Sequence, residues 1–219
     1  MNKAMHRKDR PADFKKRFVW MMVGIVGMGI VLSFLVEVSY GTDPASYFNL
    51  ALSERTGISY GTCNLLMNVV LFIPMLIFGR SRIGIGTAAN MVLIGYICDF
   101  CRWLWARLLP PALFTLQPAR GILFAVSAFL MAFCAALYMN ANLGLVPYDA
   151  APVMLAEHVR IPFYLLRIGW DFLFLVLGVL LGKKLGLATP CLVVLFGPTV
   201  KFIGNRMHMS VVSQKEKSS

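Results

Sequence analysis

Residues 18–39 read FVWMMVGIVGMGIVLSFLVEVS, an apolar run of 22 residues that only Ser33 and Glu37 interrupt before its end. A run of about 20 apolar residues is long enough to cross the hydrocarbon core of a bilayer as a helix. The run is too long for the apolar core of a signal peptide, and no small-residue cleavage site follows it. We therefore predict a retained first transmembrane helix, preceded by a leader with seven basic residues.

Five further apolar runs follow, at 62–79, 85–106, 121–141, 163–182 and 187–205. The 219 residues are 58% hydrophobic and 14% charged, with a mean hydropathy of +0.72. These values exclude a soluble globular domain, which has about a quarter of its residues charged, and also a disordered chain. The runs around Asp99 and Lys201 are the weakest predictions. Each is apolar for little more than half the length of a transmembrane helix before a charged residue occurs. We predict an all-α polytopic membrane protein with about six transmembrane helices.

The net charge of +11 would indicate nucleic-acid binding in a soluble protein. Here the basic residues lie between and outside the apolar runs, where they meet phospholipid headgroups. With the N-terminus inside, 14 basic residues fall on the cytoplasmic side and 6 on the other. The internal loops alone have 3 basic residues on the cytoplasmic side and 6 on the other, which is the reverse bias. The positive-inside rule thus predicts a cytoplasmic N-terminus, and the two chain ends dominate that prediction.

An internal repeat emerges when the chain is shifted by 103 residues, or by 102 after one deletion. Polar and helix-breaking residues are then aligned: Arg17 with Arg120, Glu37 with Asn140, Gly41 with Gly144, Pro44 with Pro147, Asn68 with Asp171, Gly79 with Gly182, Gly84 with Gly186, Thr87 with Thr189 and Gly95 with Gly197. A chance alignment of two apolar sequences would match leucines instead.

The repeat divides the chain into a basic leader, two three-helix repeats with a linker between them, and a polar tail: 1–17, 18–109, 110–119, 120–206 and 207–219. An odd number of spans in each repeat makes the second repeat insert upside down, as in many secondary transporters. If the connection after the first helix also crosses the membrane, the repeats become parallel. That alternative stays open.

The connection after the first helix of each repeat is too polar to span the membrane. Asp43 is placed to cap a short helix that begins at Pro44. In the second repeat Pro147 begins the helix, and Asp149 supplies a carboxylate to its first turn. The two short helices are either interfacial or re-entrant, with their termini lining a cavity.

Two helices carry polar pairs at a spacing of four residues, which places each pair on one face. Asn64 and Asn68 lie on one helix, and Arg167 and Asp171 lie on its mate. An ionised carboxylate inside a membrane needs a partner, so we expect an Arg167–Asp171 bridge. The bridge is either structural, or part of a site where Asp171 faces a polar cavity opposite Asn68.

Asp99 and Lys201 occupy nearly equivalent positions and could form a pair between the repeats. Lys201 could instead extend to the membrane surface from a helix end. The five cysteines lie mostly in predicted spans, where buried apolar thiols are the usual case. Because no catalytic or phosphate-binding motif occurs, we expect no metal, no cofactor and no enzymatic activity.

Several short motifs occur in a distinctive order: Gly41-Thr42-Asp43-Pro44, Gly57-Ile58-Ser59-Tyr60-Gly61-Thr62, Gly84-Ile85-Gly86-Thr87, Ile94-Gly95 and Asp99. They resemble the bacterial YczE/YyaS/YitT family of membrane proteins over residues 17–206. The resemblance implies a protein of the bacterial cytoplasmic membrane, with roles from small-molecule export to effects on secondary-metabolite production. The second half departs from the motifs, since Val146 stands opposite Asp43, so a site marked by them would be richest in the first half.

We expect a secondary transporter or exporter of a small molecule, in the bacterial cytoplasmic membrane with the N-terminus inside. The expected substrate-binding residues are Asp43, Pro44, Asn64, Asn68, Asp149, Arg167 and Asp171, with Asp99 and Lys201 as gating or counter-charge residues. The alternative is a non-transporting scaffold or accessory protein that acts on a partner enzyme. Expected partners are the small molecule and phospholipid, with no nucleic acid. A homodimer is left open.

Overall fold

The structure is a computed structural model that describes residues 11–186, 188–189, 199–200, 202–204 and 206. Its elements are α1 (Pro11–Val38), α2 (Pro44–Thr56), α3 (Tyr60–Phe78), the 3₁₀ helix η1 (Arg80–Arg82), α4 (Ile85–Leu108), α5 (Ala112–Thr115), α6 (Ala119–Ala141), α7 (Pro147–His158) and α8 (Phe163–Leu180). The described part contains no strand, which confirms the all-α prediction. The sixth predicted run, 187–205, lies mostly outside the described residues.

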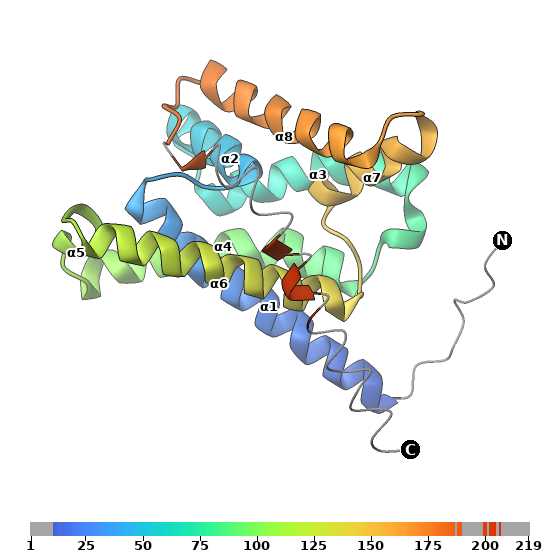
Figure 1. Cartoon of the computed structure of the whole chain (residues 1–219), viewed down its shortest axis with the longest axis horizontal. Coiled ribbons are helices and arrows are strands. Elements are labelled where there is room, and N and C mark those ends of the chain that lie inside the picture. Colours follow the sequence, from blue (N-terminus) through green and yellow to red (C-terminus); the bar gives the residue numbers. More distant parts are fainter. Residues whose placement is uncertain (1–10, 187, 190–198, 201, 205, 207–219) are drawn as a thin grey trace.

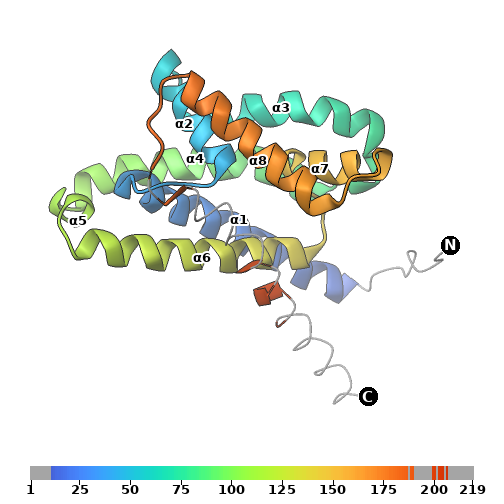
Figure 2. The same cartoon turned by 45° about the horizontal axis from the view of Figure 1, so that its top comes forward.

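The helices form two layers (Figure 1, Figure 2). Helices α1, α4 and α6 make one layer, in which α1 packs against both α6 and α4. Helices α2, α3, α7 and α8 make the other layer, and α3 joins the layers by packing against α4. Helices α1 and α6 run antiparallel along each other and bury most of the large apolar core.

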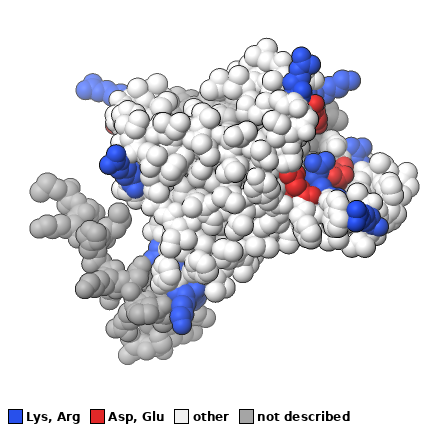
Figure 3. Space-filling view, turned by 180° about the vertical axis from the view of Figure 1, so that it is seen from behind, with Lys and Arg blue, Asp and Glu red and all other residues white. Residues whose placement is uncertain are grey.

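Four described helices are long and apolar enough to cross a membrane. These are Phe14–Val38 within α1, and α3, α6 and α8. Figure 3 shows that most of one face of the molecule carries neither basic nor acidic side chains, as a lipid-facing surface requires. Helix α4 forms over the third predicted run, but it is not among the four spans. Six spans are therefore not shown.

Two close contacts set the geometry of α1 and α6. A Cβ atom placed on Gly24 would lie 2.9 Å from both the carbonyl oxygen of Cys134 and the amide nitrogen of Tyr138. A Cβ atom placed on Gly27 would instead meet the Cys134 side chain, 2.5 Å from its Sγ atom. Small residues at such crossings let helix backbones approach, which matters in lipid because apolar burial no longer drives association.

Arginines tie together the ends of the same two helices. The Arg17 side chain donates from Nε to Ala141 O at 2.7 Å and from Nη2 to Asn142 O at 2.6 Å. The Arg120 side chain donates from Nε and Nη2 to Val38 O at 2.9 and 2.7 Å. The last carbonyls of a helix have no partner within it and carry partial negative charge. Each guanidinium therefore caps the C-terminus of the neighbouring antiparallel helix.

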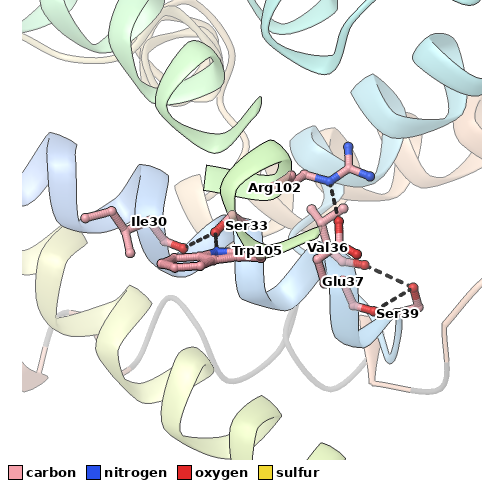
Figure 4. A network of polar contacts seen from close by, with 7 residues as sticks. All are labelled: Ile30, Ser33, Val36, Glu37, Ser39, Arg102 and Trp105. Atoms are coloured by element: carbon pink, nitrogen blue, oxygen red, sulfur yellow. Dashed lines mark hydrogen bonds and ion pairs between the residues drawn. The ribbon is translucent and has the colours of Figure 1, made fainter. Parts of the chain in front are cut away.

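A polar network joins α1 to α4 (Figure 4). Trp105 Nε1 donates to the hydroxyl of Ser33 at 2.8 Å, and Ser33 donates to Ile30 O at 2.5 Å. One turn further along α1, Glu37 forms an ion pair with Arg102 at 2.7 Å. Both polar residues that interrupt the first apolar run therefore have partners on α4.

The Gly24 contact gives a test of the α1–α6 crossing. We expect Gly24→Ala to lower the free energy of unfolding by about 1–3 kcal/mol, because the added methyl group meets backbone atoms that cannot move cheaply. Gly169 on α8 is the control, since nothing lies within 4 Å of a Cβ placed there. Thermal unfolding of the purified variants measures the difference, and equal midpoints would contradict this crossing geometry.

Candidate functional site

A cluster of charged side chains joins α7 to the middle of α8. Arg167 Nε donates to Asp171 Oδ2 at 3.2 Å, which confirms the predicted bridge. Arg167 Nη1 also donates to Asp149 Oδ1 on α7 at 2.6 Å. The hydroxyl of Tyr148 donates to Asp171 Oδ1 at 2.6 Å. Asp171 is only 5% exposed, so this carboxylate is buried and engaged at both oxygens.

The start of α2 contributes a third carboxylate. Asp43 is the N-cap, as predicted, and its Oδ2 accepts from Ser46 N at 3.1 Å, while Pro44 is the first helical residue. Its other oxygen, Oδ1, is buried and has no hydrogen-bond partner among the described residues. Burial raises the pKa of Asp43, although the hydrogen bonds from Ser46 oppose the shift and the nearby Asp149 adds to it. Asp43 is thus the carboxylate with capacity for a proton or another donor.

An apolar cluster surrounds these groups and brings the two short helices together. Its members come from both halves of the sequence repeat: Met67, Tyr148 and Phe174, with Ala45, Phe48, Leu71, Val146 and Trp170 packed against them. The Phe174 ring lies 4.9 Å from Tyr148 and 5.3 Å from Phe48, centroid to centroid. The first turns of α2 and α7 therefore meet at one cluster. Apolar walls of this kind strengthen the electrostatic interactions beside them.

Three buried asparagines form a second polar group between α2 and α3. Asn68 Nδ2 donates to the backbone oxygen of Asn64 at 2.9 Å, which fixes the orientation of that amide. Asn64 Oδ1 then accepts from Asn68 Nδ2 at 3.3 Å and from Asn49 Nδ2 at 3.2 Å. Each amide keeps one buried atom without a partner in the described part of the chain: Asn49 Oδ1, Asn64 Nδ2 and Asn68 Oδ1. The group can therefore bind a ligand or water that both donates and accepts hydrogen bonds.

The structure gives other partners to some residues that the sequence analysis placed together. Asp171 hydrogen-bonds to Tyr148 and Arg167, and no described hydrogen bond joins it to Asn68. Asp99 Oδ2 accepts from Gly61 N at 2.7 Å, which caps the first turn of α3. Lys201, its expected counter-charge, lies outside the described residues.

Sequence reasoning missed Tyr148 and Asn49. Tyr148 directly follows the predicted helix start at Pro147, but its aligned residue is Ala45, so the repeat gave no signal for it. Asn49 is fully buried, although it lies on the short helix of a connection that is too polar to span the membrane. Its spacing of three residues from Ser46, another buried polar residue, was the available signal.

The groups at the site are charges and hydrogen-bond donors and acceptors. Two carboxylates, Asp149 and Asp171, share the Arg167 guanidinium, and Asp43 adds a third carboxylate at the start of α2. The Tyr148 phenol and the three amides add neutral donors and acceptors. Within the described ranges no group of three or more His, Cys, Asp or Glu residues is placed to hold a metal ion. The arrangement can recognise a small polar or charged molecule, or exchange a proton, inside an apolar shell.

Comparisons with known proteins place the chain in a family. The profile of a Family of unknown function (DUF6198) matches residues 15–205. The "Uncharacterized membrane protein YczE" of Bacillus subtilis (strain 168) is 24% identical over 187 residues, covering 85% of this chain and 84% of the relative. An "Uncharacterized protein" of Haemophilus influenzae (strain ATCC 51907 / DSM 11121 / KW20 / Rd) is 27% identical over 189 residues, covering 84% and 80%.

The "Uncharacterized protein YyaS" of Bacillus subtilis (strain 168) is 22% identical over 186 residues, covering 83% of this chain and 89% of the relative. No solved structure matches the chain. The resemblance to YczE and YyaS is thereby confirmed. The chain is a membrane protein, and it belongs to the family of unknown function DUF6198.

Proposed function

We propose that this protein is a secondary carrier of a small molecule, built from two inverted three-helix repeats with a polar site where the repeats meet. The observation that carries the proposal is the charged cluster around the buried carboxylate of Asp171, in the middle of α8, a helix that is itself apolar enough to cross a membrane. Ionisable groups at such positions are costly to bury, and in membrane proteins they usually serve a substrate or an ion.

Contacts that come in aligned pairs support the repeat. Arg17 contacts Ala141 O, and Arg120, aligned with Arg17, contacts Val38 O, aligned with Ala141. The backbone repeats this reciprocity, because Gly86 N donates to Leu143 O at 2.9 Å. Ala188 N likewise donates to Tyr40 O at 3.0 Å. Residues 86 and 188 are aligned, as are 143 and 40, so the same contact occurs twice with the roles of the halves exchanged.

The directions of the helices support inversion. Helices α1 and α6 are equivalent in the alignment and run antiparallel (Figure 1). A two-fold axis that exchanges antiparallel helices is perpendicular to them, so it lies in the membrane plane when the helices span the bilayer. Parallel repeats would instead need an axis along the membrane normal, with α1 and α6 parallel.

The site has the position that inverted-repeat carriers use. The apolar cluster around Tyr148 contains three aligned pairs, namely Ala45 with Tyr148, Met67 with Trp170, and Leu71 with Phe174. Such a cluster lies on the axis, and the first turns of α2 and α7 enter it. In other carriers, half-helices that begin near the midplane direct their N-terminal dipoles at the substrate. This favours re-entrant over interfacial short helices.

The finer topology belongs to the same proposal. We place six spans in the bacterial cytoplasmic membrane with the N-terminus inside, phospholipid around them, and no catalytic activity. The loop after α3 then lies in the cytoplasm, and the loop after α8 lies outside.

Labelling of single cysteines tests this topology. Ser81 and Lys184 are exposed residues in these two loops. In a background without native cysteines, we expect Lys184→Cys to react with a membrane-impermeant maleimide added to intact cells. Ser81→Cys is the matched site and should react only after the cells are opened. Labelling of both sites from the same side would exclude inversion.

Removing the central carboxylate tests the carrier. We expect Asp171→Asn to reduce transport at least tenfold, because Arg167 and Tyr148 lose a charged partner. The measurement is the transient current of proteoliposomes on a solid-supported membrane, with a panel of small organic cations, anions and zwitterions. Glu37→Gln is the control, since it breaks an ion pair that is not part of the proposed site.

Two outcomes would count against the proposal. Unchanged currents in a folded Asp171→Asn protein would remove that residue from the site. A folded wild-type protein that gives no current with any member of the panel would favour the scaffold function instead.

A further inference from the structure

Two ion pairs join the halves of the chain through aligned glutamates and cations in equivalent loops. Glu54, near the end of α2, pairs with Lys183 in the loop after α8. Glu157, near the end of α7, pairs with Arg82 in the loop after α3. Residues 54 and 157 are separated by the repeat shift of 103, and both cations follow the aligned glycines at positions 79 and 182.

Helix α2 leads from the central site to the first of these pairs. Near its start, Phe48 packs edge-on against Phe174 of α8. Tyr47 lies against Gly178, where an added Cβ would come within 2.4 Å of the ring, and the Tyr47 hydroxyl donates to Lys183 O at 2.5 Å. Glu54 lies two turns beyond Tyr47 on the same face and reaches the Lys183 side chain.

Helix α7 leads to the second pair along α3. Tyr148 in its first turn packs in the central cluster, and Met154 packs with Met75 further along. Beyond Met154, Glu157 meets Arg82. Helices α3 and α8 run in opposite directions in both views (Figure 1, Figure 2), so the two ion pairs lie at opposite ends of the molecule.

The exposure of these pairs argues against a role in stability. The Glu157 and Glu54 side chains are 51% and 61% exposed, whereas their cationic partners are 20% and 21% exposed. Ion pairs in contact with solvent contribute little to folding, and they break readily. A carrier opens its site at one end at a time, so the contacts that join its halves at that end must break easily. Weak ion pairs meet this requirement.

We propose that Glu54–Lys183 and Glu157–Arg82 are the two gates of the central site, each closing the path along one short helix. With both pairs formed, the structure is the closed state between the two open ones. Breaking one pair lets the halves separate at that end while the other pair holds the opposite end. This inference rests on the proposed carrier function and describes how access to its site is controlled.

Site accessibility tests the gates without a known substrate. Ala45 lies at the central cluster and accepts a cysteine with little change in volume. In the cysteine-free background carrying Ala45→Cys, we expect Glu54→Gln to increase the rate of labelling by an impermeant maleimide at least threefold from one side of the membrane. Glu157→Gln, its counterpart in the repeat, should produce a similar increase from the opposite side only.

The matched control is Glu37→Gln, which breaks an ion pair with Arg102 inside one half and should leave both rates unchanged. A disulfide between Glu54→Cys and Lys183→Cys should suppress labelling from the first side. This variant provides a second test of the same gate if the glutamine variant does not fold. The proposal of two gates would be overturned if both variants increased the labelling rate from the same side, or if neither variant changed it. Loss of transport with Asp171→Asn, together with unchanged accessibility in both gate variants, would reject the gates and retain the carrier.

Discussion

The antiparallel contact between α1 and α6 is the constraint on which the other contacts depend. Its ends are fixed by two arginines, each of which caps the carbonyls of the neighbouring helix, and its centre is fixed by glycines that let the backbones touch. The last carbonyls of a helix have no partner within it, so these charged contacts tie each helix end to its neighbour and define the register. With the register fixed, both turns that follow α1 and α6 carry the chain back to the same region of the other layer.

In that region apolar packing lies beside charged side chains, a combination that is costly in most proteins. The cluster around Phe174 is apolar, and the charges of Arg167 and Asp171 lie directly beside it. Burial of an ion pair costs more than it returns unless further hydrogen bonds complete the geometry. Asp149 and the Tyr148 hydroxyl provide those bonds, so the cluster is stable enough to persist and polar enough to recognise a ligand.

The two halves share a framework but differ in chemistry. Where one half has Asn64 and Asn68, the other has Arg167 and Asp171, and Val146 stands opposite Asp43. One half therefore offers neutral amides while the other offers a paired charge. Among the described residues, the buried carboxylate oxygen without a hydrogen-bond partner belongs to Asp43. A purely structural repeat has no need for this difference, because symmetric apolar contacts would pack equally well.

Local patterns in the sequence predicted the features that depend on neighbours along one helix. The helix over residues 18–39, the cap at Asp43 and the bridge from Arg167 to Asp171 all follow from spacings of a few residues. The partners across helices required tertiary structure: Tyr148 reaches Asp171, and Asp99 caps α3 at Gly61. The physical reason is that a spacing of four residues fixes the face of a helix, whereas its rotation and crossing against another helix follow from side-chain packing, which a single sequence does not encode locally.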